Sequence, residues 1–328
     1  MNKPLILIAG GAGYIGSHMV KRLRADSFNV LVLDNFSTGF RDSLLGAPYV
    51  EGSIGDATLL EQLFSRHPVE AVINFASLIA VGESVQKPDL YYRNNVAETL
   101  VLLETMVRHG INKFLFSSTA AVYGSPDHVP VCETATKAPV SPYGRSKWMI
   151  EQVLEDFDRA FNFRSVALRY FNAAGADPDG ELGERHDPET HLIPLALQVA
   201  SGRRAQLDVY GDDYPTPDGT CIRDYIHVVD LCEAHLLALD HLLSGGESCA
   251  FNLGNGQGFS VNQVINTVEA VTGRKVTTRT CPRRSGDPSI LVASSDAIRA
   301  KLGWSPRRAG LAKIVEDAWR FELTLKMI

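Results

Sequence analysis

The sequence predicts an α/β protein built on a doubly wound parallel sheet, with a smaller mixed α/β lobe. Two observations carry this prediction. Between residues 5 and 172, short apolar segments alternate with segments of helical period, as in repeated βαβ units. A glycine-rich turn follows the first apolar segment and leads directly into the first helical one, an arrangement that is typical of a Rossmann-like sheet.

The strands and helices of this sheet can be assigned in order along the chain. Buried strands are predicted at residues 5–10, 29–34, 70–76, 111–119 and 163–172. The helices between them are predicted at residues 14–26, 57–67, 88–110 and 143–160. Because crossovers between parallel strands are right-handed, these segments are expected to form one sheet with helices on both faces.

The chain changes character after Asn172, where it becomes rich in Gly, Pro, Asp and His. This composition predicts long functional loops. Helix and strand patterns resume at residues 224–239 and 249–256 and can return to the sheet. The predicted division is a first domain of residues 1–172 with 225–256, and a second lobe of residues 173–224 with 257–328.

Composition excludes several classes of function. The 328 residues are 45% hydrophobic and 21% charged, with a net charge of −6, which argues against nucleic acid or an anionic membrane as the main partner. We find neither a secretory segment nor an apolar run long enough to span a membrane. The five cysteines are odd in number and lack a CxxC spacing, which favours reduced thiols in a cytoplasmic protein.

The turn at residues 10–16 predicts a dinucleotide site. Gly10 permits the tight turn, Gly13 lets the backbone approach a pyrophosphate, and Gly16 lets the helix pack closely on the strand. Asp34 ends the next strand, where a carboxylate can bind both ribose hydroxyls and repel the extra phosphate of NADP, so the expected cofactor is NAD. The alternative is that Asp34 only caps the following turn. Asp56 is placed either to hold the adenine amino group or to cap a turn.

Tyr143 and Lys147 lie four residues apart, just after Pro142 at a predicted helix start. They are therefore expected on one helical face. Taken alone, this spacing fits an ordinary solvated helix as well as a catalytic pair.

Four segments in this order resemble the extended short-chain dehydrogenase/reductase family: GGAGYIG (10–16), FSSTAAVYG (116–124), YGRSK (143–147) and RYFNAAG (169–175). Further segments resemble the UDP-glucose 4-epimerases within that family, along nearly the whole chain: VGESVQKP, YFNAAGADPDGELGE, DYPTPDGTCIRDYIHV and RRSGD. The resemblance implies an NAD-dependent isomerase that interconverts UDP-glucose and UDP-galactose through a 4-keto intermediate, which turns over while bound. It also implies that the first domain binds NAD and the second lobe binds the UDP-sugar.

The resemblance assigns catalytic roles to three residues. Tyr143 is expected to be the acid/base at the sugar 4-hydroxyl, and Thr119 is expected to bind the same oxygen. A free tyrosine has a pKa of about 10 and is a poor base at neutral pH. Lys147 and an oxidised nicotinamide are expected to favour the phenolate of Tyr143.

The resemblance also implies binding residues. Contacts to the cofactor beyond the three glycines, Asp34 and Asp56 are expected from Tyr14, Ile15, Asn35, Ile54, Phe75, Ala76, Asn94, Ser117, Tyr143, Lys147 and Tyr170. Contacts to the UDP-sugar are expected from Asn172, His191, Leu192, Asp208, Val209, Tyr210, Arg223, Arg284, Asp287 and Leu291. Among these, Arg223 and Arg284 are expected on the pyrophosphate, whose charge suits bidentate guanidinium groups. Each can instead be a residue that stabilises a loop or the surface.

Alternatives of other kinds remain open. Dehydratases of the family carry an acid–base pair after the threonine, where this chain has Ala120 and Ala121, so dehydration is not expected. A non-catalytic NAD-binding sensor would tend to lose the tyrosine or the lysine. Ile79 and His191 depart from residues common in relatives, so the preferred sugar can be UDP-xylose/arabinose or UDP-N-acetylglucosamine. His186 and His191 suggest a metal pair, but no metal is expected because the cofactor supplies the redox chemistry.

Two further expectations concern assembly and substrate range. The helices at residues 88–109 and 143–160 are expected to build a homodimer, because the former is apolar beyond the needs of one sheet face. Leu291 is expected at the wall beside the sugar 2-position, where a tyrosine in relatives excludes N-acetyl groups. The alternative is that Leu291 packs in the core on a strand.

Overall fold

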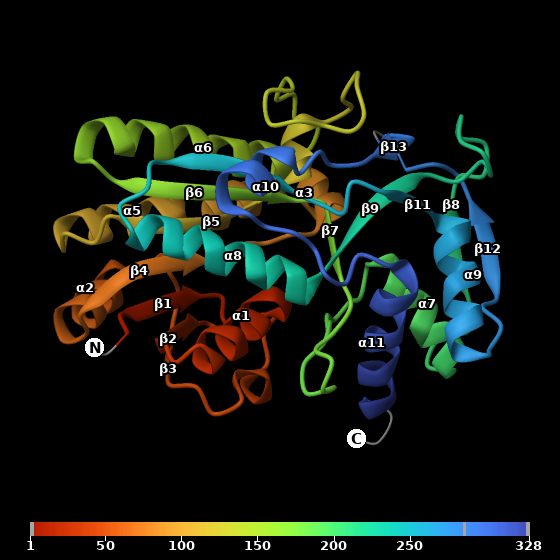
Figure 1. The fold of residues 1–328 in the computed structure, drawn as a ribbon, viewed down its shortest axis with the longest axis horizontal. Helices are drawn as coiled ribbons and strands as arrows, with labels where there is room; N and C mark the ends of the chain where they lie inside the picture. The colour runs from red at the N-terminus through yellow and green to blue at the C-terminus, as the bar shows by residue number, and fades with distance from the viewer. Residues whose placement is uncertain (1–2, 285–286, 326–328) are drawn as a thin grey trace. The chain divides into compact units, whose positions relative to one another are not determined.

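The structure, a computed structural model, describes residues 3–284 and 287–325 (Figure 1). The chain divides into two compact units. The first comprises Met1–Gly124, Lys137–Arg169 and Cys232–Phe251, and the second comprises Ser125–Thr136, Tyr170–Leu231 and Asn252–Ile328. Ser285 and Gly286 of the RRSGD segment lie outside the described residues. Among the described helices, none is both long and apolar enough to cross a bilayer.

A seven-stranded sheet forms the centre of the first unit, in the order β10-β6-β5-β4-β1-β2-β3 (Figure 1). The strands are β1 (Leu5–Ala9), β2 (Asn29–Asp34), β3 (Tyr49–Glu51), β4 (Val69–Asn74), β5 (Lys113–Thr119), β6 (Arg164–Tyr170) and β10 (Cys249–Leu253). β1 pairs in parallel with both β2 and β4, so the strand order reverses there. In open parallel sheets, ligands bind outside the carboxyl ends of the strands at such a reversal.

Helices flank this sheet, as the sequence predicted. They are α1 (Tyr14–Ala25), α2 (Ala57–Arg66), α3 (Val81–Gln86), α4 (Pro88–Tyr91), α5 (Thr99–Arg108), α6 (Pro142–Phe161) and α8 (Val228–Leu243), with short turns η1 (Arg41–Leu44) and η3 (Ala120–Tyr123). The segment predicted as one helix at residues 88–110 is a continuous helical run with a π-helical stretch, η2 (Tyr92–Glu98), between α4 and α5. Leu7, Val72, Leu102 and Phe114 are fully buried between sheet and helices.

The structure corrects three details of the sequence assignment. β3 was not predicted, because three residues are too few to show a period. The predicted strand at residues 163–172 ends at Tyr170, and Asn172 starts a separate strand, β7 (Asn172–Ala174). The predicted helix at residues 224–239 begins as a strand, β9 (Ile222–His227), before α8 starts at Val228.

The second unit is a smaller mixed α/β structure, as predicted. Its four-stranded sheet has the order β11-β9-β13, with β7 also paired to β9, and β12 pairs with β8 separately. The remaining elements are α7 (Leu192–Ser201), β8 (Leu207–Tyr210), β11 (Gly258–Ser260), α9 (Val261–Thr272), β12 (Thr278–Cys281), β13 (Ile290–Leu291), α10 (Asp296–Leu302) and α11 (Leu311–Thr324). Helices α7, α9 and α11 pack together around Ala196, Val264 and Ile314, which are fully buried.

Candidate active site

The glycine turn after β1 has the close contacts that its sequence predicted. Gly10 has φ +75°, and a Cβ there would lie 2.6 Å from the backbone nitrogen of Ala76. A Cβ on Gly16 would overlap the carbonyl oxygen of Gly10. A Cβ on Gly13, by contrast, would meet only that oxygen, at 3.5 Å, so the space in front of Gly13 is open. Gly13 is also the N-cap of α1, and no side chain caps the helix there. The N–H groups of a helix N-terminus beside open space suit a phosphate.

A pocket opens at this turn, at the carboxyl ends of the parallel strands. Predicted cofactor residues that line it are Gly10, Gly13, Asp34, Asn35, Ile54, Phe75, Ala76 and Asn94. Lining residues that the sequence analysis did not name are Leu33, Ser37, Thr38, Gly39, Gly52, Ser53, Ser77, Leu78 and Glu98. Ser37, Thr38 and Gly39 could have been found, because they belong to the turn that follows Asp34, the predicted end of the second strand.

Other predicted cofactor residues are not among the described residues that line this pocket. They are Tyr14, Ile15, Gly16, Asp56, Ser117, Tyr143 and Lys147 in the first unit, and Tyr170 in the second. Their cofactor contacts stay predictions.

Asp34 is buried and combines both interpretations of its sequence position. Its carboxylate accepts hydrogen bonds from the backbone N–H of Ala12 at 2.8 Å and of Phe36 at 2.8 Å, so it does hold the turns around it. It also lines the pocket, where its oxygens retain lone pairs for a ligand. Asp56 caps α2 instead, since its side chain accepts a hydrogen bond from the N–H of Leu59 at 3.0 Å.

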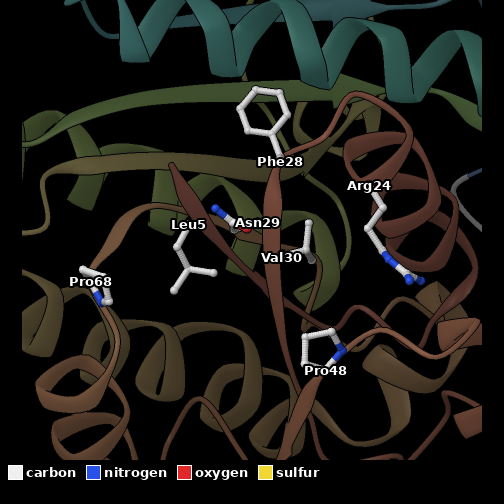
Figure 2. A pocket seen from close by; sticks show the side chains of 7 residues that line it. All are labelled: Leu5, Arg24, Phe28, Asn29, Val30, Pro48 and Pro68. Carbon is white, nitrogen blue, oxygen red and sulfur yellow. The ribbon is translucent and has the colours of Figure 1, made fainter. Parts of the chain in front are cut away.

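A second hollow of the first unit lies at the other end of the strands (Figure 2). It is lined by Leu5, Arg24, Phe28, Asn29, Val30, Pro48 and Pro68. Leu5 and Asn29 are the first residues of β1 and β2. This hollow is therefore at the amino ends of the strands, away from the edge where such sheets bind ligands.

Tyr143 lies in the first turn of α6, and Thr119 is the last residue of β5. Pro142 is the first residue of α6, and the hydroxyl of Ser141 caps the helix by accepting from the N–H of Gly144 at 3.2 Å. Thr119 ends β5, and its hydroxyl oxygen accepts from the N–H of Ala121 at 3.1 Å. Burial raises the pKa of Tyr143, and the hydrogen bond from Thr119 works against that rise.

Lys147 is 1% exposed, which rules out the solvated-helix interpretation of this position. Its ammonium nitrogen donates to the hydroxyl of Ser77 at 2.8 Å and to the carbonyl oxygen of Ser117 at 2.8 Å. Burial lowers the pKa of Lys147 to about 7, although the charge of Glu151 opposes this. Lys147 is therefore not among the groups that lower the pKa of Tyr143. Of the causes that we expected, the positive charge of the nicotinamide remains.

A buried ion pair lies behind this site and was missed from the sequence. Glu151, one turn after Lys147 on α6, accepts from the Nε of Arg169 at 3.0 Å. Glu151 also accepts from the hydroxyl of Ser118 at 2.5 Å, and Arg169 donates to the phenol oxygen of Tyr123 at 2.8 Å. Since Ser118 directly precedes Thr119, this network braces the strand end that carries the predicted catalytic hydroxyl.

The predicted UDP-sugar residues all belong to the second unit. The guanidinium of Arg223 donates to the carboxylate of Asp287 at 2.5 Å and to the carbonyl oxygen of Pro288 at 2.7 Å. The guanidinium carbon of Arg284 lies 4.0 Å from the ring centre of Tyr210. These contacts bring four of the predicted residues together in two pairs.

The remaining predicted residues have structural partners. The side chain of Asn172 donates to the carbonyl oxygen of Asp224 at 2.9 Å. Asp208 forms an ion pair with Arg279 at 2.8 Å. Leu291 lies on β13, opposite Arg223 of β9, and is half-buried, so a strand-packing role is compatible with its position. His191 is the N-cap of α7 and contacts Glu184 and Glu189.

Comparison with known proteins decides the family. The model of the NAD-dependent epimerase/dehydratase family matches residues 6–254. The chain belongs to this family. An epimerase relative, the UDP-glucose 4-epimerase of Halalkalibacterium halodurans, is 49% identical over 316 residues, which cover 96% of this chain and 95% of the relative.

Solved structures of epimerases agree with this membership. The UDP-glucose 4-epimerase from Brucella ovis in complex with NAD has a TM-score of 0.95 and 46% identity, covering 97% of this chain and 98% of that one. The UDP-Glc/GlcNAc 4-epimerase from Campylobacter jejuni has a TM-score of 0.85 and 44% identity, covering 98% and 99%. The resemblance seen in the sequence is confirmed, as are the doubly wound fold and the NAD cofactor. The turn at Gly10, the open space at Gly13 and the carboxylate of Asp34 fit that cofactor.

Proposed function

We propose that this chain interconverts UDP-glucose and UDP-galactose by oxidation and reduction at carbon 4 of the sugar. The observation that carries the proposal is the buried ammonium of Lys147, which lies one helical turn from Tyr143 on α6. Lys147 in turn donates to Ser77, which lines the pocket at the glycine turn. Many curated relatives at similar identity carry the name UDP-glucose 4-epimerase, which supports this choice.

The chain's own residues perform proton transfer and positioning in this scheme. When bound, NAD supplies the acceptor and then the donor of the hydride at carbon 4. Tyr143 takes the proton of the 4-hydroxyl and returns it after the sugar has turned over, while Thr119 orients the oxygen. Lys147, with its pKa near 7, can hold or release a proton at neutral pH and so balance the charge of Tyr143. Ala120 and Ala121 after Thr119 carry no acid or base for dehydration.

The grip on the nucleotide is assigned to the second unit. Arg223 and Arg284 carry the positive charge suited to a pyrophosphate, and Asp287 and Asn172 offer polar groups for the ribose and the nucleotide. The backbone of residues 208–210 is assigned to the uracil. In this assignment the first unit binds NAD and the second binds the UDP-sugar.

The activity is tested with the purified protein and UDP-galactose. The enzyme should form UDP-glucose, and protein denatured afterwards should release NAD. Release of NAD with no turnover of any UDP-sugar would support the sensor alternative instead. Turnover confined to UDP-xylose/arabinose or to UDP-N-acetylglucosamine would keep the epimerase class and replace the sugar.

A homodimer is the proposed assembly, built on α4–α5 and α6. Apolar side chains are exposed on α4 and α6, where Leu90 and Met149 are 39% and 42% exposed. Val81 and Val85, which are 48% and 64% exposed, lie on α3, which contacts both of these helices. A charge at Val85, which is the most exposed of these, should separate the subunits in Val85→Glu. Light scattering at the assay concentration measures this, and an active wild type that is strictly monomeric contradicts the assembly. A cytoplasmic location is also proposed, supported by five free thiols.

A further inference from the structure

Four side chains with metal-ligating atoms converge in the loop that leads into α7. Glu184, His186, Glu189 and His191 each offer one ligand atom, and these four atoms lie within 4.8 Å of one another. From the sequence no metal was expected at His186 and His191, because the cofactor supplies the redox chemistry. That Glu184 and Glu189 lie beside these histidines is seen only in the structure.

The distances between the imidazole nitrogens and the carboxylate oxygens bracket the ligand separation of a tetrahedral shell. The Nδ1 of His191 lies 2.7 Å from an oxygen of Glu184 and 3.2 Å from one of Glu189. The Nδ1 of His186 lies 3.4 Å from the same oxygen of Glu184 and 3.6 Å from the other oxygen of Glu189. Ligands at about 2.0–2.1 Å from a tetrahedral Zn²⁺ are separated from each other by roughly 3.3 Å. Both imidazoles therefore present Nδ1 to the same two carboxylates.

The surroundings hold the carboxylates in place. The side chains of Glu184 and Glu189 are each only 5% exposed. An oxygen of Glu189 also accepts from the backbone N–H groups of Thr190 at 2.7 Å and His191 at 2.9 Å. Hydrogen bonds of this kind orient ligating carboxylates in known metal sites.

We propose that Glu184, His186, Glu189 and His191 form a structural site for a divalent transition metal, with Zn²⁺ as the best match to two nitrogen and two oxygen ligands. Four protein ligands close the shell, as in structural sites, so the metal takes no part in the sugar chemistry. It pins the loop to the start of α7, where His191 is the N-cap and Leu192 the first residue. The site does not depend on the proposed function.

The alternative is a cluster of ion pairs without metal. In such a cluster the imidazoles of His186 and His191 pair directly with Glu184 and Glu189, and the two ring centroids lie 5.4 Å apart. A divalent ion bound between the same groups would be balanced by the two carboxylates.

Titration of the chelator-treated holoenzyme with Co²⁺ tests the site. Wild type should bind one Co²⁺ per chain with a saturable visible d–d spectrum and without the thiolate charge-transfer bands that binding at Cys132 would give. His186→Gln should weaken this binding by at least about tenfold, as for losses in metal sites generally. The matched control His128→Gln, at an exposed histidine outside the cluster, should leave it unchanged.

Thermal unfolding provides a second readout. Zn²⁺ should raise the melting temperature of wild type and of His128→Gln, and should not raise that of His186→Gln or Glu184→Gln. Retention of NAD by each variant shows that it has folded. No saturable Co²⁺ binding in wild type, thiolate bands in its spectrum, or equal affinity in folded His186→Gln would each overturn the proposal.

Discussion

The ammonium nitrogen of Lys147 donates a hydrogen bond to the hydroxyl of Ser77 at 2.8 Å. Ser77 lines the pocket at the glycine turn, whereas Lys147 lies one turn from Tyr143 on α6. A single contact thus links the proposed cofactor pocket to the proposed acid/base. It also makes Ser77 a positioning residue for Lys147, together with the carbonyl oxygen of Ser117.

Removal of the Ser77 hydroxyl tests this link. Ser77→Ala leaves Lys147 with one of its two hydrogen bonds, and a lost bond to a charged group costs about 1.5–3 kcal/mol. Turnover of UDP-galactose should fall by at least about tenfold. Ser37→Ala, at another serine of the same pocket, is the matched control. If both variants lose the same activity, the bond to Lys147 has no special role.

Asp34 should determine the affinity for NAD. In Asp34→Asn an amide replaces one of the two oxygens that accept from Ala12 and Phe36, and the negative charge near the ribose is lost. The affinity of stripped enzyme for NAD should fall on the order of 10- to 100-fold, since each tenfold is about 1.4 kcal/mol. Fluorescence titration with NAD measures it.

Asp56→Ala provides the comparison with a capping carboxylate. Loss of this N-cap of α2 should cost about 1 kcal/mol of stability. Because Asp56 is not among the described residues that line the pocket, the affinity for NAD should change little. A loss of affinity as large as that of Asp34→Asn would return Asp56 to the adenine role considered from the sequence.

How much could be predicted from the sequence depended on whether a feature is local. The glycine turn joins consecutive elements, and Tyr143 and Lys147 are four residues apart, so pattern alone located both. Ser77 is 70 residues from Lys147, and Arg169 is 18 residues from Glu151, so their pairing arises only in the folded chain. The chain leaves the large sheet at Tyr170, because the next strand, β7, pairs with β9. The hydrophobic patterns of β7 and β9 do not show which strand each of them pairs with.

The site's electrostatics were the hardest part to predict. The charge of Lys147 was expected to lower the pKa of Tyr143. Instead, burial raises the pKa of Tyr143 and lowers the pKa of Lys147. The cause is that packing removes both groups from water, and packing cannot be read from a five-residue motif. The meeting of Glu184 and Glu189 with the two histidines likewise depends on how the loop before α7 closes on itself.

The buried pair of Glu151 and Arg169 should be required for stability. Arg169 is only 4% exposed, and Glu151→Gln leaves its guanidinium without a counter-charge. Breaking such a buried pair costs about 3–5 kcal/mol of stability. Chemical denaturation should show this loss. Glu155→Gln is the control on the same helix, since its pair with Arg159 is exposed, at 3.7 Å, and should change stability by less than about 1 kcal/mol. Equal stability of the two variants contradicts the bracing role of Glu151.

Leu291 tests the substrate range. If it walls the sugar 2-position, the wild type should turn over UDP-N-acetylglucosamine as a side activity, and Leu291→Tyr should lose that activity while keeping UDP-galactose, because the added ring overlaps the acetyl group. Relative turnover of the two substrates is the measurement. A variant that loses both activities equally points to a packing role on β13, opposite Arg223.

Tyr143→Phe tests the central claim most directly. The substitution removes only the phenol oxygen that hydrogen-bonds Thr119, so the pocket and the second unit should still bind NAD and UDP. The measurement is the conversion of UDP-galactose to UDP-glucose at saturating substrate, alongside the NAD content of the same preparation. The account predicts full NAD content with turnover lower by about 10²- to 10⁴-fold, the usual worth of a general acid/base. Turnover near that of the wild type, with NAD bound, would contradict it.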